Sequence, residues 1–331
     1  MTAFAPADPA TLPLDAAVRD WMRRVAELSS GLPRLASPDP AVRRAAGLRL
    51  SDRLAAEFAD PVAPGVLIDD IALSGGAGPL RARRFRPRAA VPPFPSLLWL
   101  HGGGFVGGTI DEILNDRLGS ALALRSGVQI ISLEYRLAPE HPFPAPVDDA
   151  VAAFGHVRAH ADRFDVDPHR LGIGGNSAGA AIATSAMLRL RDGGTRVHHQ
   201  ALEVLPATLQ PYGRSAAEYR HGFGLDDALE VAELYRAGAP DSEASPLLAA
   251  DHRDLPPALL MLAEFDPLRD GGLAYGELLR AAGVPVTVHV GAGHLHGTPG
   301  LTARWQGARD WQHVFADELA RAYGTGHAVP G

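Results

Sequence analysis

The chain has 331 residues, of which 46% are hydrophobic and 21% are charged, as is ordinary for a folded globular protein. Cysteine and lysine are both absent, which excludes disulfides, thiolate metal sites, cysteine nucleophiles, lysine Schiff bases and a lysine-containing phosphate loop. The formal net charge of −7 argues against nucleic acid or an anionic membrane surface as the main partner, so we expect a small-molecule ligand.

Two helices are predicted before any strand. Apolar residues recur at helical spacing over 15–28, and a second helical pattern covers 40–58. Two apolar runs follow at 66–73 and 80–85, and they predict the antiparallel opening of a sheet. We therefore expect residues 1–60 to form a helical cap region that precedes the domain at 61–331.

After these runs, short apolar segments alternate with helical ones. The predicted strands are 96–100, 129–134, 171–173, 202–205, 259–263 and 286–290, and the predicted crossover helices are 148–160, 178–191, 226–237, 271–282 and 301–323. This order predicts a mostly parallel sheet with helices on both faces, whose active residues lie at the carboxyl ends of the strands. The proline-rich stretch 206–225 fits neither layer, so we expect 206–237 to contribute to the cap.

A first chemical motif, Gly175–Gly179, has the sequence G-N-S-A-G and lies between a predicted strand and a predicted helix. In this G-x-S-x-G context a sharp turn projects the serine hydroxyl away from the sheet, toward a base and a substrate. The amino end of the helix also favours negative charge at the reacting carbonyl. The alternative is a plain glycine-rich turn in which Ser177 only caps the helix.

A second glycine-rich segment, His101–Phe105, follows the strand predicted at 96–100. Consecutive glycines leave backbone N–H groups open to a tetrahedral oxygen, so we assign the oxyanion hole to Gly103 and Gly104 together with the amide of Ala178. A phosphate-binding loop is the alternative, but the segment lacks G-x-G-x-x-G and the chain lacks lysine. His101 is expected to hold the loop in place.

A serine nucleophile needs a base and an acid, which follow it along the chain in hydrolases with this motif. Asp266 comes after the next-to-last predicted strand and His296 after the last one, 30 residues later. That separation accommodates one helix and one strand. Sequence separation alone leaves Glu264 and Asp270 as competitors of Asp266, and His294 as a competitor of His296.

Histidine pairs at 294/296 and 198–199 raise the question of a metal site. Neither pair has a third ligand at a recognisable zinc spacing. We therefore expect no metal and no cofactor, with the proton carried by histidine and the imidazolium stabilised by aspartate.

Taken together, these motifs resemble those of the hormone-sensitive-lipase-like family of α/β-hydrolases, which includes bacterial carboxylesterases with an H-G-G-G loop. The matching blocks are His101–Phe105, Tyr135–Pro146, Gly175–Gly179 and Asp266–Asp270 with His296–Gly297. The resemblance implies the α/β-hydrolase fold with an N-terminal helical cap and no cofactor. It also implies Ser177 as the nucleophile, Asp266 as the acid and His296 as the base, with Tyr135–Pro146 buttressing the site.

The sequence departs from the family pattern at two positions. Asn176 stands where the family usually has Asp or, in one branch, Thr, so a charge beside the nucleophile is missing. Asparagine keeps the size and the hydrogen bonding, so we expect activity to survive. Thr298 stands where the family commonly has Phe, and we expect it to open or polarise the wall near the base.

We therefore predict a serine carboxylesterase that acts through an acyl-enzyme, and the resemblance implies that its esters have short to medium acyl chains. The alternatives are an amidase or lactonase that uses the same triad, and a non-catalytic small-molecule receptor of the same fold. The first residues lack a basic region followed by an apolar core, and no apolar run is long enough to span a membrane. We expect a cytoplasmic protein without stable membrane insertion or nucleic-acid binding, and the resemblance adds a homodimer formed through a sheet edge.

Overall fold

The computed structural model describes residues 6–326, and its strands form one sheet. The strands are β1 (Val66–Gly75), β2 (Gly78–Pro87), β3 (Phe94–Leu100), β4 (Gln129–Leu133), β5 (Val166–Asn176), β6 (Gln200–Glu203), β7 (Ala258–Phe265) and β8 (Val286–Leu295). Their order across the sheet is β1-β2-β4-β3-β5-β6-β7-β8. Among these strands β2 alone runs opposite to the rest, so the predicted antiparallel opening and the parallel remainder are both confirmed.

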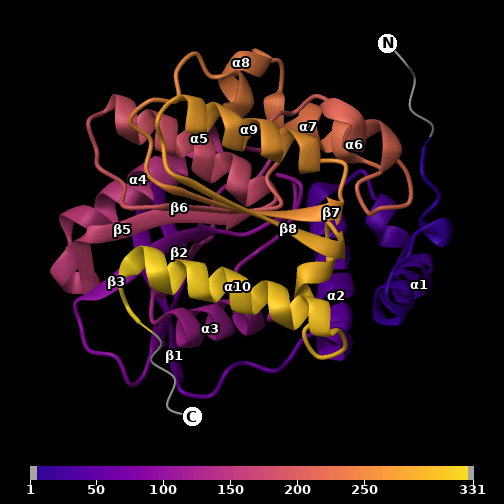
Figure 1. Ribbon diagram of the computed structural model, residues 1–331, viewed down its shortest axis with the longest axis horizontal. Coiled ribbons are helices and arrows are strands. Elements are labelled where there is room, and N and C mark those ends of the chain that lie inside the picture. The colour runs from indigo at the N-terminus through magenta and orange to yellow at the C-terminus, as the bar shows by residue number, and fades with distance from the viewer. Residues whose placement is uncertain (1–5, 327–331) are drawn as a thin grey trace.

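Helices cover both faces of the sheet. They are α1 (Ala16–Ser30), α2 (Pro40–Phe58), α3 (Ile113–Ser126), α4 (Ala145–Ala159), α5 (Ala178–Asp192), α6 (Gly213–Glu218), α7 (Ala228–Arg236), α8 (Asp241–Ala244), α9 (Arg269–Ala281) and α10 (Gln306–Tyr323). Helices α4, α5 and α9 lie on one face, and α3 and α10 lie on the other (Figure 1). The predicted three-layer α/β architecture is confirmed.

The strands of the sheet centre are apolar on both sides because both of their faces are covered. Successive side chains of β3 point to opposite faces, and the neighbours Leu97 and Leu98 are both fully buried. Leu98 belongs to the apolar core under α4 and α5, and Leu97 belongs to the core under α3 and α10. A continuous apolar run therefore specifies a buried parallel strand here.

Helices α1, α2, α6 and α7 gather at the end of the sheet where the parallel strands finish (Figure 1). A third apolar cluster joins α1, α2 and the segment after α6 to the strand ends, and it includes Val18 of α1, Phe58 of α2, Tyr219, and Phe265 of β7. Burial of this cluster holds the amino-terminal helices over the carboxyl edge. The helix predicted at 226–237 is α7, but it lies over this edge and is not a crossover along the face of the sheet.

Helix α3 was not predicted from the sequence. Its apolar residues do not form one stripe, because the helix packs against α2 and α10 as well as against the sheet. Gly119 in its middle lies so close to the Phe85 ring that an added Cβ would come within 3.0 Å of it. Neighbouring elements thus fix α3 more strongly than its local pattern does.

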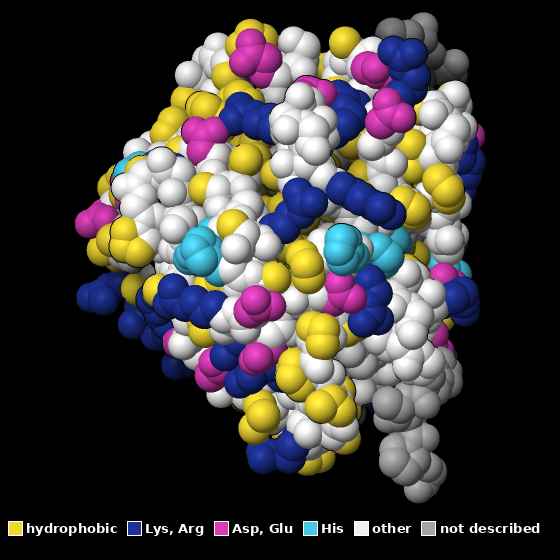
Figure 2. Space-filling model, turned by 90° about the vertical axis from the view of Figure 1, so that its left-hand side faces the viewer, with side chains coloured by type: hydrophobic (Ala, Val, Ile, Leu, Met, Phe, Trp, Pro, Cys, Tyr) yellow, Lys and Arg dark blue, Asp and Glu magenta, His cyan; other side chains and the backbone are white. Residues whose placement is uncertain are grey.

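At the opposite end of the molecule, over the amino ends of the parallel strands, basic and acidic side chains are interspersed with apolar ones among the described residues (Figure 2). Within residues 6–326, no helix has both the length and the apolar character required to cross a membrane.

Candidate active site

Ser177 lies in a sharp turn between β5 and α5. Its backbone has φ 52° and ψ −121°, a conformation that L-residues rarely adopt and that costs about 1–3 kcal/mol. The Ser177 N–H donates to the carbonyl of Glu203 at 2.8 Å, which ties the turn to the end of β6. At Gly175 an added Cβ would lie 2.4 Å from the carbonyl carbon of Gly179, so only glycine allows the two ends of the turn to come so close.

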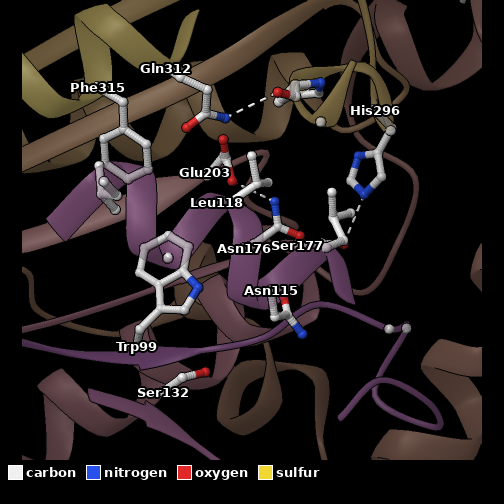
Figure 3. Close-up of a pocket in the computed structure, with 18 of the residues that line it drawn as sticks. Trp99, Asn115, Leu118, Ser132, Asn176, Ser177, Glu203, His296, Gln312 and Phe315 are labelled. Atoms are coloured by element: carbon white, nitrogen blue, oxygen red, sulfur yellow. Dashed lines mark hydrogen bonds between the residues drawn. The ribbon is translucent and has the colours of Figure 1, made fainter. Parts of the chain in front are cut away.

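Three side chains predicted from distant parts of the sequence meet at this turn. His296 Nε2 lies 2.8 Å from Ser177 Oγ, and His296 Nδ1 lies 2.8 Å from Asp266 Oδ2. Figure 3 shows His296 directed at Ser177. Asp266 is only 1% exposed, and its second oxygen accepts the Leu268 N–H at 2.9 Å, so the carboxylate is held in one orientation. This order of groups can move a proton from the hydroxyl to the imidazole.

The competing carboxylates have structural partners instead. Glu264 accepts the backbone N–H of Gly293 at 2.7 Å and shapes the end of β8. Asp270 accepts the backbone N–H of Ser215 at 2.9 Å, which connects α9 to α6. The geometry therefore brings Asp266 to the imidazole and leaves the two competitors elsewhere.

His294 and Thr298 hold the loop that carries His296. The His294 ring packs between Trp305 and Trp311, and burial lowers its pKa to about 4. The Thr298 hydroxyl lies 2.9 Å from His294 Nδ1 and accepts the Leu295 N–H at 3.0 Å. Thr298 is fully buried and does not line the cavity beside the base. The expectation that it opens or polarises that wall is wrong, because its hydroxyl is used within the turn.

The predicted oxyanion amides lie beside Ser177. Gly103 and Gly104 border the cavity that contains Ser177, and neither amide donates to a backbone or side-chain acceptor among residues 6–326. Ala178 is the first residue of α5, where a backbone N–H has no partner within the helix. Gly103 has φ 129°, and a Cβ there would lie 2.2 Å from the Gly107 carbonyl oxygen. Glycine is thus required for the loop to close on itself.

Residues behind the glycine loop hold it rigidly, as predicted for His101 and Tyr135. The Tyr135 hydroxyl donates to the His101 carbonyl at 2.7 Å, and the two rings stack with centroids 4.4 Å apart. Arg44 of α2 donates to the carbonyls of Val106 and Ala138, both at 2.7 Å. Helix α2, predicted as part of the cap, is therefore anchored to the segment that follows the predicted oxyanion glycines.

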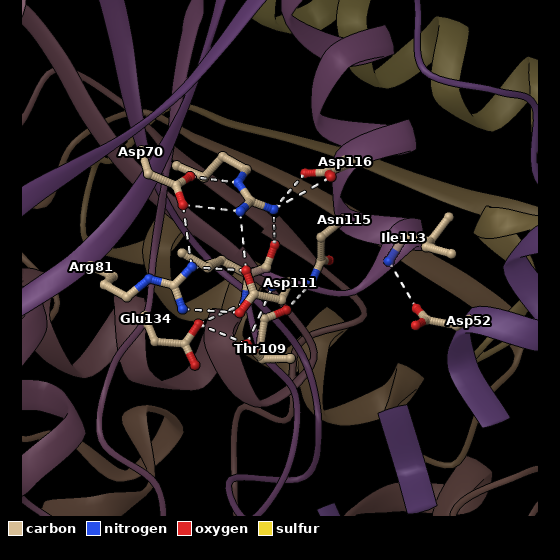
Figure 4. A network of polar contacts seen from close by, with 11 residues as sticks. Asp52, Asp70, Arg81, Thr109, Asp111, Ile113, Asn115, Asp116 and Glu134 are labelled. Atoms are coloured by element: carbon tan, nitrogen blue, oxygen red, sulfur yellow. Dashed lines mark hydrogen bonds and ion pairs between the residues drawn. The ribbon is translucent and has the colours of Figure 1, made fainter. Parts of the chain in front are cut away.

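The next part of the same loop is fixed by polar contacts to the sheet (Figure 4). Glu134 at the end of β4 accepts the Ile110 N–H at 2.7 Å and the Thr109 hydroxyl at 3.0 Å. Arg83 of β2 donates to the Ile110 carbonyl at 3.0 Å while pairing with Asp70 and Asp116. These contacts fix the path from the oxyanion glycines to α3.

A buried carboxylate that sequence reasoning missed lies behind the nucleophile. Glu203 is 3% exposed and accepts one hydrogen bond from Asn176 Nδ2 and one from Trp311 Nε1, each at 2.6 Å. Burial raises the pKa of Glu203, whereas the two donors and the nearby His296 act to lower it. A carboxyl group of β6 therefore lies beside position 176. Only the pairing of β5 with β6 brings Asn176 opposite Glu203.

Asn176→Asp, which restores the residue usual in the family, is expected to destabilise this chain. The substitution removes a donor and places a second carboxylate 2.6 Å from Glu203, in a buried site where two like charges cannot both ionise. We expect a loss of roughly 3 kcal/mol at neutral pH. The loss should shrink at acidic pH because a proton shared by the two carboxyl groups relieves the repulsion. Thermal unfolding measured over a pH series checks this.

The matched control is the double variant Asn176→Asp/Glu203→Gln. It reverses the donor and acceptor within the pair, so most of the lost stability and its pH dependence should return. If the single variant is as stable as the parent at neutral pH, Asn176 and Glu203 do not form the proposed buried pair.

Two cavities open from Ser177, one on each side. One of about 390 Å³ runs toward α3 and α10 and borders His296. The other, of about 400 Å³, lies under α6 and α7 and borders Ala178. A small substrate thus has room on both sides of the hydroxyl, as a two-part ester requires.

The described residues contain no group of three or more His, Cys, Asp or Glu side chains arranged to hold a metal ion. His198 Nε2 lies 3.0 Å from the Ala322 carbonyl, and His199 is buried, which lowers its pKa to about 3. His198 and His199 therefore pack within the protein and do not form a metal site with other described residues.

Comparisons with known proteins agree with this geometry. A family model described as alpha/beta hydrolase fold matches residues 97–299. The chain is 38% identical to esterase LipI of Mycobacterium tuberculosis over 250 residues, which cover 72% of this chain and 77% of LipI. It is 35% identical to an ethyl acetate hydrolase of Pseudomonas putida, over 69% of this chain and 74% of that protein.

Among solved structures, the chain is similar to ester hydrolase EH1AB1 from the metagenome of Lake Arreo. The TM-score is 0.85 at 34% identity, and the match covers 94% of this chain and 99% of the other. The structural match thus extends beyond residues 97–299, the part of the chain that the family model matches. The chain belongs to the hormone-sensitive-lipase-like family of α/β-hydrolases.

Proposed function

We propose that this protein is a serine carboxylesterase that hydrolyses esters of short to medium acyl chains through an acyl-enzyme. The observation that carries the proposal is the pair of 2.8 Å contacts that joins Asp266, His296 and Ser177. Relatives named esterase LipI and ethyl acetate hydrolase support the same chemistry.

In the first step, Ser177 Oγ attacks the ester carbonyl carbon while His296 Nε2 accepts the hydroxyl proton. The amides of Gly103, Gly104 and Ala178 donate to the negative oxygen that forms. His296 then gives the proton to the departing alcohol as the carbon–oxygen bond breaks, which leaves an acyl group on the serine.

In the second step, water takes the place of the alcohol. His296 removes a proton from this water, the resulting hydroxide attacks the acyl carbon, and Ser177 leaves with the proton returned by the imidazole. Asp266 orients the imidazole and stabilises its charged form in both steps, and it does not itself take the proton. The proposed reaction steps require no metal or cofactor.

Covalent labelling tests the assignment of the nucleophile. A fluorophosphonate should add its phosphonyl mass to the peptide that contains Ser177, and hydrolysis of short acyl esters should stop in proportion to labelling. A protein that takes no label and hydrolyses no ester would instead be a receptor of the same fold.

A substrate panel separates ester hydrolysis from the alternatives. We expect kcat/KM to be highest for p-nitrophenyl esters of short to medium acids and lower for matched lactones and anilides. Faster turnover of lactones or anilides would reassign the protein as a lactonase or amidase. The cytoplasmic location and the homodimer stay predictions, to be checked by cell fractionation and by light scattering.

A further inference from the structure

The cavity on the α3 and α10 side of Ser177 combines apolar walls with a few polar groups. Its apolar walls include Leu118 and Leu122 of α3 and Phe315 of α10. Figure 3 shows Ser177 and His296 at one end of this space and Trp99 and Ser132 at another. A binding site of this kind takes its specificity from the few polar atoms that face the ligand.

Two of those polar atoms have no partner among residues 6–326. The Ser132 hydroxyl belongs to a residue that is 3% exposed, and it makes no hydrogen bond to any residue from 6 to 326. The indole N–H of Trp99 also donates to no acceptor in the described part of the chain, although the ring packs on Phe315 with centroids 5.8 Å apart. The Trp99 side chain is half-buried, so its N–H is open to the cavity, whereas the Ser132 hydroxyl is fully enclosed. Buried polar atoms normally have partners, so the Ser132 hydroxyl points to a ligand, with the indole N–H as a second donor beside it.

The sheet brings the two groups together. Trp99 of β3 and Ser132 of β4 are direct partners in the parallel register, so their side chains lie next to each other on the same face. Trp99 is also opposite Gly174 of β5, three residues before Ser177. At about 3.3 Å per residue this row lies roughly 10 Å from the nucleophile along the strand. Only a substrate of medium length reaches from the serine to the row.

The side-chain amides of the cavity and Glu203 each have at least one hydrogen bond within the described part of the chain. Asn115 Nδ2 donates to the Thr109 carbonyl at 2.7 Å, and Gln312 Nε2 donates to the Pro299 carbonyl at 3.1 Å. Each oxygen of Glu203 accepts one hydrogen bond from the protein. The Gly103 and Gly104 amides lie at the Ser177 end of the cavity, and the side-chain amides each keep one bond to the protein. At the far end, the indole N–H and the serine hydroxyl are the donors without any partner among residues 6–326, and both suit an oxygen acceptor.

The charge around the cavity favours a neutral acceptor. No arginine is among the described residues that line it, so a carboxylate or phosphate would find no cation there. Glu203 is acidic and faces the same space, which disfavours an anionic group further. A hydroxyl, keto or ether oxygen can accept hydrogen bonds from both donors, and because it is neutral it needs no cation beside it.

We propose that this cavity is a specificity subsite for esters that carry a neutral oxygen on a medium-length chain, with Trp99 and Ser132 as the residues that recognise this oxygen. The inference rests on the proposed esterase function and names the substrate class of the same site. The chain in question is either the acyl part or the alcohol part of the ester, since the cavity borders both Ser177 and His296.

The experiment measures a ratio of kcat/KM between an oxygenated ester and its plain hydrocarbon analogue. One arm uses a series of esters with the same leaving group, in which the hydroxyl or keto group is placed on successive carbons of the acyl chain. In the other arm the same groups move along the alcohol with a constant acyl chain. We expect the ratio to reach at least about tenfold at one position in one arm, and the arm identifies which part of the ester enters.

Two variants assign the preference to these side chains. Ser132→Ala removes only the hydroxyl, and Trp99→Phe keeps an aromatic ring against Phe315 without the N–H; each should bring the ratio close to one. The matched control is Ser185→Ala, at a buried serine of α5 on the other face of the sheet, which should keep the parent ratio. Thermal unfolding of all three variants confirms that they fold.

Three results overturn the inference. These are a ratio near one at every position in both arms, a high ratio that neither Ser132→Ala nor Trp99→Phe reduces, and a ratio that falls equally in Ser185→Ala. In each case the parent still hydrolyses plain esters, so the proposed function stands. A parent that hydrolyses neither plain nor oxygenated esters defeats the proposed function instead.

Discussion

Replacement of Ser177 by alanine is expected to lower kcat for a short acyl ester by about 10⁶-fold, because the attacking oxygen is lost while the rest of the site remains. The change removes one atom from a turn whose backbone is held by the Ser177 N–H bond to Glu203. Substrate should therefore still bind, and the phosphonate label should not attach. Ester hydrolysis assays with the purified variant measure the loss of kcat, and the intact-protein mass shows whether the phosphonate label attaches.

A second variant tests whether Ser177 and His296 act as one unit. His296→Ala removes the base 2.8 Å from the hydroxyl, and its loss in kcat should be similar to that of Ser177→Ala. The double variant should lose little more than either single variant, since each change alone disables the same step. Losses that multiply in the double variant would show that the two side chains act independently.

Much of the candidate site was predictable because several of its residues belong to short motifs that are contiguous in the sequence. Gly175–Gly179 and His101–Phe105 each combine a strand end with glycines that the turn requires. A buried strand before each motif is visible as an apolar run, so sequence alone gives the edge of the sheet where the motifs meet. The choice of Asp266 over Asp270, however, came from the family resemblance, and the structure gives the physical reason, since Asp270 binds the Ser215 backbone.

The features that sequence reasoning missed depend on contacts between distant segments. Glu203 lies in a short apolar strand, and only its pairing with β5 reveals that it faces Asn176. The role of Thr298 follows from its bonds to His294 and Leu295, and these depend on the path of the loop after β8. Helix α3 is covered on several sides, so no single apolar stripe marks it.

Helix α7 contacts the loop that carries the proposed oxyanion glycines. Tyr235 of α7 stacks on Phe105 with ring centroids 4.0 Å apart, and its carbonyl accepts the Phe143 N–H at 2.8 Å. Phe105 directly follows the oxyanion glycines and has a φ of 66°. A shift of α7 would therefore move the residue beside the amides that we propose hold the oxyanion.

Asp266→Asn is expected to reduce kcat by about 10⁴-fold with little change in substrate binding. Asparagine has nearly the same shape, and its carbonyl oxygen can still accept the Leu268 N–H. Its NH₂ group then faces His296 Nδ1, which must become an acceptor, so the ring proton moves to Nε2. A protonated Nε2 cannot take the hydrogen from Ser177, and the site loses its base although its geometry is kept. Single-turnover kinetics with a chromogenic ester measure the loss.

Asp270→Asn is the matched control because it changes the competing carboxylate four residues later. That carboxylate accepts the Ser215 N–H and pairs with Arg269, so its replacement should loosen the contact between α6 and α9 and lower the unfolding temperature. The chemical step should remain within a few-fold of the parent, since Asp270 does not contact the imidazole. If Asp270→Asn loses as much activity as Asp266→Asn, or if Asp266→Asn keeps most of it, the orientation of His296 does not depend on Asp266 as proposed.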